Sequence, residues 1–512
     1  MKQDSGATKS VWLQSANFPP TDSLDETHID ICVIGAGISG LSCAYQLCTD
    51  GRAVVVLDDG PIAGGETCRT TAHLASALDD RFVEVERLHG RDGSRLAYES
   101  HAAAIDRIEQ IVEAENIDCE FQRVDGFLFA GENYSANDMR KEFEAAERAG
   151  FCGAMYPAKL PYEDAVTTAC IRFPRQAQFD PIKYLAGVAS AIRNAGGKIV
   201  SNQFVTVVEE KDGVAKITLD GGRVLTADFC VVATNAPIVS LEMQLKQAPY
   251  RSYAIAAEVP KGSVPAGLYW DTEDPYHYVR LQHGNEQSDS ETDLLIVGGE
   301  DHKTGTDHDP AHRFGALYAW AKFRFPQLGA VKFQWSGQVM EPADALAFIG
   351  RAPGFKNVFV STGDSGMGMT HGTIAGMLIP DLIHGKNNPW KSLYDPSRRT
   401  MGGLLTLVKE NLTAVPQLLA AVLPGEVNSI DDIEPGSGAV IREGLNKVAV
   451  HRANTGKLQK LSAVCTHLGC EVEWNHLEKT WDCPCHGSRF KTDGTVLNGP
   501  ATDPLKSVDA EK

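Results

Sequence analysis

The chain has 512 residues, of which 43% are hydrophobic and 22% are charged, a composition typical of a folded globular protein. This length predicts two or three domains. The formal net charge of −19 at pH 7 argues against a nucleic-acid partner, because phosphates are bound by clusters of Lys and Arg.

The sequence also sets expectations about location and thiol chemistry. It contains no run of about 18 apolar residues, so we expect no membrane-spanning helix. Residues 1–26 lack the apolar core of a secretory signal, which makes a cytoplasmic protein the expectation. Isolated cysteines in a reducing compartment are expected to be small buried residues. They are Cys32, Cys43, Cys48, Cys68, Cys119, Cys152, Cys170 and Cys230.

The first predicted unit is a strand, a helix and a second strand. Residues 29–34 form a short apolar run typical of a buried strand. A helical pattern follows to residue 47, and residues 53–57 form another apolar run. This order is typical of the start of a dinucleotide-binding fold.

Three glycines, Gly35, Gly37 and Gly40, stand where the first strand meets the helix. Glycines at this spacing make the tight turn, let the backbone approach a pyrophosphate and let the helix pack closely on the strand. The helix N-terminus then attracts the phosphates. Asp58 ends the second strand and can accept hydrogen bonds from a ribose. A glycine-rich turn without a ligand is the alternative.

Four separated segments carry a family resemblance. They include "VIGAGISGLSCAYQL" at residues 33–47, "GGETCRTTAHL" at 64–74, "FCVVATNAP" at 229–237, and residues 335–385. Together they resemble the FAD-dependent D-amino-acid oxidase/glycine oxidase superfamily. The resemblance implies FAD rather than NAD, and an α/β (α+β) fold of two subdomains over residues 28–385.

The resemblance also divides this part of the chain. Residues 1–27 would be an N-terminal extension. The Rossmann-like FAD-binding parts would be about 28–80, 175–240 and 335–385, and the mixed-sheet substrate-domain parts about 81–174 and 241–334. Some relatives attach FAD to a cysteine near the end of the flavoprotein part, but no cysteine occurs between Cys230 and Cys465. FAD is therefore expected to be bound non-covalently.

The resemblance assigns further residues to FAD binding beside the glycines and Asp58. They are Arg69, Thr70, Thr71, Val205, Thr234, Gly363, Asp364, Gly366, Met367, Gly368 and Thr370. A helix is expected to begin near Thr370, and its N-terminus can face the flavin edge on which negative charge develops. The alternative for Thr370 and His371 is plain capping of that helix.

The substrate is expected to lie under the mixed sheet of the second subdomain. In "DPYHYVRLQ" the side chains of Tyr276, Tyr278 and Arg280 share one face, with His277 and Val279 on the other. Tyr278 and Arg280 are candidate substrate contacts, since an Arg can hold a carboxylate with two hydrogen bonds. His73 is a third candidate near the flavin. An ordinary half-exposed strand is the alternative.

The chain leaves the flavin-binding part through residues 386–430, where amphipathic patterning predicts linker helices. Residues 431–512 then form a small, mostly β domain, with a hairpin around Gly444–Asn446 and a further strand in 456–465.

A cluster of four cysteines and three histidines follows in residues 465–490. Structural zinc suits such residues. However, "CTHLGC" and "CPCHGSRF" resemble the two loops of a Rieske [2Fe–2S] domain. The resemblance implies that Cys465 and Cys483 bind one iron and that His467 and His486 bind the other, which raises the reduction potential above that of an all-Cys cluster.

The same resemblance implies a disulfide between Cys470 and Cys485, which joins the two loops. His476 matches no ligand position and is expected at the surface. "GPATDPL" at 499–505 resembles the proline loop that covers the cluster.

One residue departs from the respiratory Rieske pattern. Those proteins have a Ser and a Tyr that donate hydrogen bonds to sulfur. Here the Ser is present as Ser488, but Phe490 occupies the Tyr position. We therefore expect a lower cluster potential than in the respiratory proteins.

These features favour an FAD-dependent oxidoreductase that oxidises the C–N bond of an amine or amino acid and relays electrons singly between flavin and cluster. The partners would be that small substrate and an external electron acceptor or donor. The alternatives are a cluster-fed flavin reductase or monooxygenase, and a redox sensor or electron-transfer protein without a small substrate. Direct transfer requires the two cofactors to lie close together.

Overall fold

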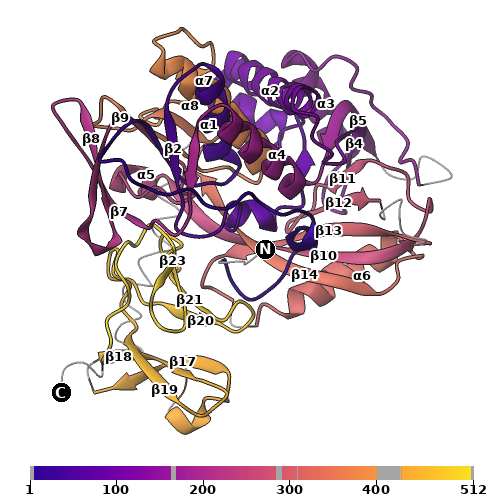
Figure 1. Ribbon diagram of the computed structural model, residues 1–512. Coiled ribbons are helices and arrows are strands. Elements are labelled where there is room, and N and C mark those ends of the chain that lie inside the picture. Colours follow the sequence, from indigo (N-terminus) through magenta and orange to yellow (C-terminus); the bar gives the residue numbers. More distant parts are fainter. Residues whose placement is uncertain are drawn as a thin grey trace.

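The computed structural model describes residues 5–162, 169–283, 291–307, 309–400, 427, 429–444 and 446–508. Figure 1 shows a large α/β body and a small all-β part, which is formed by the C-terminal residues and lies against one side of it. In these described ranges, no helix is both long and apolar enough to cross a membrane.

The first sheet of the body is mainly parallel and runs in the order β15–β16–β9–β1–β2–β6. β1 pairs in parallel with β2 and β9, and the β7–β8 hairpin is attached through β9. The strands are β1 His28–Ile34, β2 Val54–Leu57, β6 Lys198–Val200, β7 Val205–Lys211, β8 Val214–Leu219, β9 Val224–Val232, β15 Phe348–Arg351 and β16 Val358–Thr362.

Three helices pack together beside this sheet: α1 Ile38–Thr49, α4 Pro181–Asn194 and α7 Gly368–Ile383. Every residue of β2 and β16 is buried, which explains why these strands are continuous apolar runs rather than alternating ones. The predicted strand, helix and second strand at residues 28–57 are confirmed.

The second sheet is mixed and runs in the order β14–β10–β13–β12–β11–β4–β5–β3. Its strands are β3 His73–Leu74, β4 Gln122–Phe129, β5 Cys170–Gln178, β10 Gln247–Pro260, β11 Leu268–Asp271, β12 His277–Gln282, β13 Thr292–Lys303 and β14 Val331–Pro342. α6 His312–Arg324 packs against β10 and β13. The remaining helices of the body are α2 Phe82–Ala114, α3 Ala136–Arg148, α5 Leu241–Leu245 and α8 Lys391–Tyr394.

The strands of this sheet do not keep to the predicted segments. β3 and most of β14 come from ranges assigned to FAD binding, because the chain crosses between the two sheets next to the cavity that they share. Cys152 is exposed, while the other seven isolated cysteines are buried as expected. The amphipathic stretch of the predicted linker, residues 401–423, lies outside the described residues.

The segment before β1 is part of the packed body rather than a loose extension. A short 3-10 helix covers Val11–Gln14, and Trp12 is buried. The Trp12 indole donates to the carbonyl of Thr70 at 2.6 Å, and Ser10 donates to the carbonyl of Cys68 at 2.5 Å. The N-terminal segment therefore braces residues 68–70.

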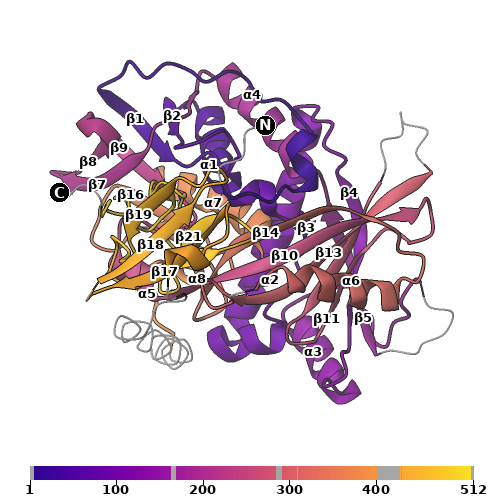
Figure 2. The same ribbon diagram turned by 90° about the horizontal axis from the view of Figure 1, so that it is seen from below.

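The C-terminal part contains two small antiparallel sheets. The first is β17 Ser437–Glu443, β18 Asn446–Arg452 and β19 Leu458–Ser462, which confirms the predicted hairpin and strand. The second is β20 Glu473–Asn475, β21 Thr480–Asp482, β22 Arg489–Phe490 and β23 Val496–Asn498. In Figure 1 the second sheet lies toward the large body and the first lies away from it, and Figure 2 shows the same part from below.

Candidate functional site

A cavity of about 320 Å³ opens between the two sheets of the body, and most of the residues assigned to FAD line it. These are Gly35, Gly37, Asp58, Arg69, Thr70, Thr71, Val205, Thr234, Gly363, Asp364, Gly366, Met367, Gly368 and Thr370. Among the candidate substrate contacts, His73 and Tyr278 line the cavity as well. Gly40 and Arg280 are not part of its wall.

The glycine turn leaves no room for side chains. At Gly35 φ is +106°, and a Cβ there would lie 2.4 Å from the carbonyl oxygen of Ala233. At Gly40 a Cβ would lie 1.9 Å from the Gly35 carbonyl oxygen, so Gly40 serves close helix–strand packing. The Asp58 carboxylate accepts from the N–H of Ala36 at 2.5 Å and of Gly60 at 2.9 Å, which fixes it at the mouth of the turn.

The turn between β16 and α7 forms another wall of the cavity. α7 begins at Gly368 with Met367 before it, and no side chain caps it. Thr370 instead donates to the carbonyl of Met367 at 3.1 Å and pairs with His101 at 2.8 Å. His371 donates through Nδ1 to the carbonyl of Asp364 at 2.8 Å, and burial lowers its pKa to about 4. Neither side chain caps the helix, and His371 is neutral.

The roof of the cavity comes from β12 and β3. The rings of His73 and Tyr278 meet edge to face with centroids 5.5 Å apart. Thr71 bonds to Nδ1 of His73 at 3.1 Å. Burial and the nearby Arg280 charge lower the pKa of His73 to about 3, so its ring is neutral. Tyr276 lies on the same face and also lines the cavity.

Arg280 was predicted to contact substrate, but it does not line the cavity. It is 1% exposed, and its Nη1 donates to the carbonyls of Ala72 at 3.0 Å and Phe179 at 2.9 Å, while Nη2 donates to Gln282. Its guanidinium also lies over the Trp12 ring. Arg280 therefore ties the strands together behind the wall, and its position gives no support to a carboxylate contact.

Several half-buried carboxyl groups lie at one end of the cavity. Burial raises the pKa of Asp79 to about 6 and that of Asp80 to about 7, the latter with a contribution from the Asp79 charge. Burial and the Asp80 charge also hold the pKa of Glu341 well above its ordinary value. The Ser365 hydroxyl oxygen lies 2.8 Å from a carboxyl oxygen of Asp80 and 2.8 Å from one of Glu341. This end of the site is thus rich in acids with elevated pKa values.

The iron-binding loops lie in the C-terminal part, with the two candidate ligand pairs brought together. The rings of His467 and His486 are 5.0 Å apart, and Nδ1 of each is buried without a hydrogen-bond partner among the described residues. Hydrogen bonds from Cys483 and from backbone N–H groups lower the pKa of Cys465 to about 7. Two neighbouring thiols and two free imidazole nitrogens are the donor set that a Rieske cluster requires.

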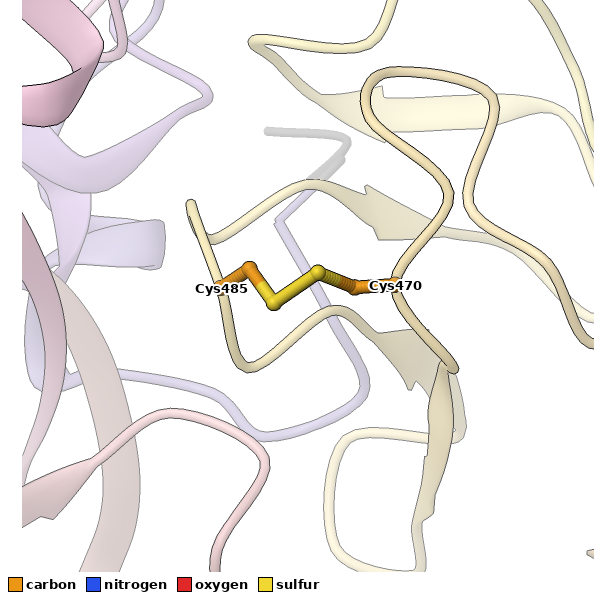
Figure 3. Close-up of a disulfide and its surroundings, with 2 residues drawn as sticks. All are labelled: Cys470 and Cys485. Carbon is orange, nitrogen blue, oxygen red and sulfur yellow. A yellow bond between two sulfur atoms is a disulfide. The ribbon is translucent and has the colours of Figure 1, made fainter. Parts of the chain in front are cut away.

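A disulfide joins the two loops, as Figure 3 shows for Cys470 and Cys485, with sulfurs 2.00 Å apart. The Cys483 sulfur lies within 4.8 Å of both disulfide sulfurs, but these are oxidised and cannot act as thiolate ligands. Residues 499–505 cover the loops: the Ala501 N–H donates to Ser488 at 3.0 Å, and Thr466 donates to the Asp503 carbonyl at 2.6 Å. His476 is exposed as predicted.

The two cofactor sites share a wall. Leu497, Asn498, Gly499, Ala501 and Thr502 of the C-terminal part line the large cavity. The histidine side of the iron site faces the body as well, because Nε2 of His467 bonds to Oε1 of Gln244 at 2.7 Å.

A buried ionic cluster fixes this arrangement. Glu478, in the turn between β20 and β21, is fully buried against Arg69 at 3.0 Å and Arg251 at 3.3 Å. Thr8 and Ser336 also donate to its carboxylate. These two arginines, with a further contribution from Arg489, lower the pKa of Glu478 to about 2 against the opposing effect of burial. The carboxylate therefore remains ionised.

The fold and the two sites define a flavoprotein that carries its own Rieske domain. A family model described as FAD dependent oxidoreductase matches residues 30–382, and one described as Rieske [2Fe-2S] domain matches residues 424–509. The chain belongs to this family of FAD dependent oxidoreductases, and its cofactors are FAD and a Rieske [2Fe–2S] cluster.

Similar proteins agree with this assignment. YhfW of Bacillus subtilis (strain 168) is 31% identical over 99% of this chain and 98% of its own length. The gamma-glutamylputrescine oxidoreductase of Escherichia coli (strain K12) is 26% identical over 74% of this chain and 89% of its own. The fold resembles glycine oxidase from Geobacillus kaustophilus, with a TM-score of 0.61 at 16% identity over 73% of this chain and 99% of that one.

Reasoning from the sequence missed three contributors to the site: the N-terminal segment, Gln244 and Glu478. Each acts through contacts between segments that lie far apart in the chain. The apolar run Val11, Trp12 and Leu13 in a mostly polar stretch is a local signal that residues before 28 could be packed.

Proposed function

We propose that this protein oxidises the C–N bond of an amine in the cavity and relays the electrons singly between its flavin and its Rieske centre to an external one-electron acceptor. When bound, FAD takes up two electrons from substrate and the cluster carries one at a time. The observation that carries the proposal is the shared wall, in which the Rieske domain lines the flavin cavity with Leu497, Asn498, Gly499, Ala501 and Thr502.

Different residues of the chain would bind the two cofactors. Gly35, Gly37 and the first turn of α1 would receive the pyrophosphate of FAD, with Asp58 near the ribose. Thr70, Thr71, Val205, Thr234 and the turn from Gly363 to Thr370 would line the rest of the cofactor. Cys465, Cys483, His467 and His486 would hold the cluster.

The walls would also exclude water and orient substrate. His73, Tyr276 and Tyr278 close the roof with aromatic rings, and His73 and His371 are kept neutral by burial. Among the described residues that line the cavity, no Lys occurs and Arg69 is engaged by Glu478. This lining favours an amine over an amino acid, because a substrate carboxylate would find no free cation.

An anaerobic reductive titration tests the relay. With an active amine, flavin and cluster absorbance should both bleach, and about one and a half equivalents of a two-electron substrate should complete the reduction. Cys483→Ser should lose the cluster signal and bleach its flavin with about one equivalent. A cluster that stays oxidised beside a fully bleached flavin would overturn the relay.

A further inference from the structure

The end of the cavity beneath β12 combines aromatic rings with a carboxylate. The rings of Tyr276 and Tyr278 are 5.5 Å apart, and both line the cavity. The Tyr276 hydroxyl donates to Oδ2 of Asp79 at 3.2 Å, which orients that carboxylate in the wall. Trp270 of β11, the neighbour of Tyr278 across the two strands, adds a third aromatic ring.

A second carboxyl group stands behind Tyr278. The hydroxyls of Tyr278 and Ser252 are 2.7 Å apart, and Ser252 in turn hydrogen-bonds to Asp301. Oδ1 of Asp301 is buried and has no hydrogen-bond partner in the described part of the chain. Each of the two tyrosines therefore has a carboxyl group behind it, Asp79 for Tyr276 and Asp301 for Tyr278.

Among the described residues that line the cavity, no free positive side chain faces these acids. Arg69, the one Arg or Lys among the described lining residues, is held by Glu478 and by the carbonyl of Ser336. Arg81 acts on Asp79 from outside the wall, where its guanidinium lies over the Tyr134 ring and donates to the Thr272 carbonyl. A positively charged group of a ligand could therefore pair with the carboxyl group in the cavity wall.

We propose that the substrate is an aliphatic diamine or polyamine without a carboxylate, whose second ammonium group pairs with Asp79 beside the rings of Tyr276 and Tyr278. An ammonium gains from both the carboxylate and the aromatic faces in a site shielded from water. A carboxylate placed there would face Asp79 without a partner and would lose its hydration.

This inference rests on the proposed function, which supplies the reacting nitrogen. Bound FAD would supply the two-electron oxidant: the carbon beside that nitrogen would lose a hydride, the nitrogen would lose one proton, and water would hydrolyse the resulting imine. The reacting nitrogen must be neutral for this step, so the charge held by Asp79 belongs to the other nitrogen.

The test uses the FAD- and cluster-loaded protein under anaerobic conditions. Putrescine, a four-carbon diamine, is compared with γ-aminobutyrate, which has the same length but ends in a carboxylate. Binding is read from the perturbation of the flavin spectrum and oxidation from its bleaching. Putrescine should bind about tenfold more tightly or better, as expected for one charged hydrogen bond.

Asp79→Asn should raise the putrescine dissociation constant by about 10- to 100-fold and erase the preference. Asp80→Asn is the matched control, since Asp80 is the neighbouring acid but does not line the cavity. It should change the dissociation constant by less than about twofold. If Asp79→Asn fails to fold, the cation site is still tested by whether the unaltered protein binds putrescine more tightly than γ-aminobutyrate.

The outcomes separate the two proposals. Asp79-dependent binding of putrescine without bleaching would support the cation site and overturn amine oxidation. Bleaching by amino acids, with γ-aminobutyrate bound as tightly as putrescine, would overturn the cation site and leave the oxidation intact. If Asp79→Asn and the unaltered protein bound putrescine equally tightly, the cation site would also be overturned.

Discussion

Carboxyl groups at the Rieske interface and at the cavity behave in opposite ways. Glu478 is surrounded by arginines, and its pKa falls to about 2. Asp79, Asp80 and Glu341 are half-buried near one another, and the pKa of each is raised. Burial opposes the charged form in both places, so the presence of positive partners decides which form exists.

The difference separates a structural contact from a binding site. At the interface three arginines, Arg69, Arg251 and Arg489, meet three acids, Glu66, Glu478 and Asp482, and the charges balance within the protein. At the cavity the balancing charge is missing from the wall. Charges balanced within the protein suit a docked domain. Carboxyl groups without a positive partner in the wall suit a site for a cationic ligand.

The largest expected effect is that of Glu478→Gln. The substitution leaves Arg69 and Arg251 without their buried counter-charge, which should lower the free energy of unfolding by about 3–5 kcal/mol in urea titrations. Glu209→Gln is the control, because the Glu209–Lys216 pair is 3.2 Å long but about half exposed. Its effect should stay below about 1 kcal/mol. Equal losses in the two variants would contradict the role given to Glu478.

The pH dependence of the same variant should follow from the lowered pKa. Glu478 binds its proton less readily in the folded protein than in the unfolded chain, so its contribution is complete above pH 4.5 and is lost as the pH falls toward 2. The unaltered protein should lose melting temperature through this window more steeply than Glu478→Gln. If the melting temperatures of the two proteins fell in parallel below pH 4.5, Glu478 would not be ionised in the folded protein.

A smaller effect of opposite sign is expected for Glu341→Gln. The folded protein holds the proton of a raised-pKa acid that the unfolded chain has already released, so stability falls as the pH rises above the ordinary Glu pKa of 4.5. Removing this acid should stabilise the protein by about 1 kcal/mol at pH 8 and leave it unchanged at pH 4, measured by thermal unfolding. A loss of stability at pH 8 would show that Glu341 has a positive partner.

The smallest change concerns the cluster alone. Ser488 is fully buried and its hydroxyl hydrogen-bonds to Cys465, while Phe490 is buried without a hydroxyl. Phe490→Tyr should raise the midpoint potential of the cluster by adding a donor to sulfur, and Ser488→Ala should lower it by removing one. Both are measured by redox titration, and shifts of the same sign in the two variants would contradict this account.

Local patterns account for what the sequence predicted well. The glycine spacing, the apolar runs at 29–34 and 53–57 and the two cysteine–histidine loops each lie within a short stretch. Short-range sterics fix the strands and the glycine turn, while the resemblance of the two loops to a Rieske domain implied the Cys470–Cys485 bridge. Arg280 shows the limit of local patterns. Strand alternation predicted the face on which its side chain lies, but not that it would bond to the carbonyls of Ala72 and Phe179.

By itself, the sequence determined the dinucleotide-type glycine turn and the two cysteine–histidine loops, since these depend on residue types at fixed local offsets, and its resemblance to known families implied the two cofactors. The tertiary structure decided everything that depends on pairing between distant segments. It placed Glu478 against Arg69, brought Gln244 to His467, moved Arg280 behind the cavity wall and left Asp79 without a counter-charge inside it. Whether a buried charge is balanced is a property of its three-dimensional neighbours, and no local spacing encodes it.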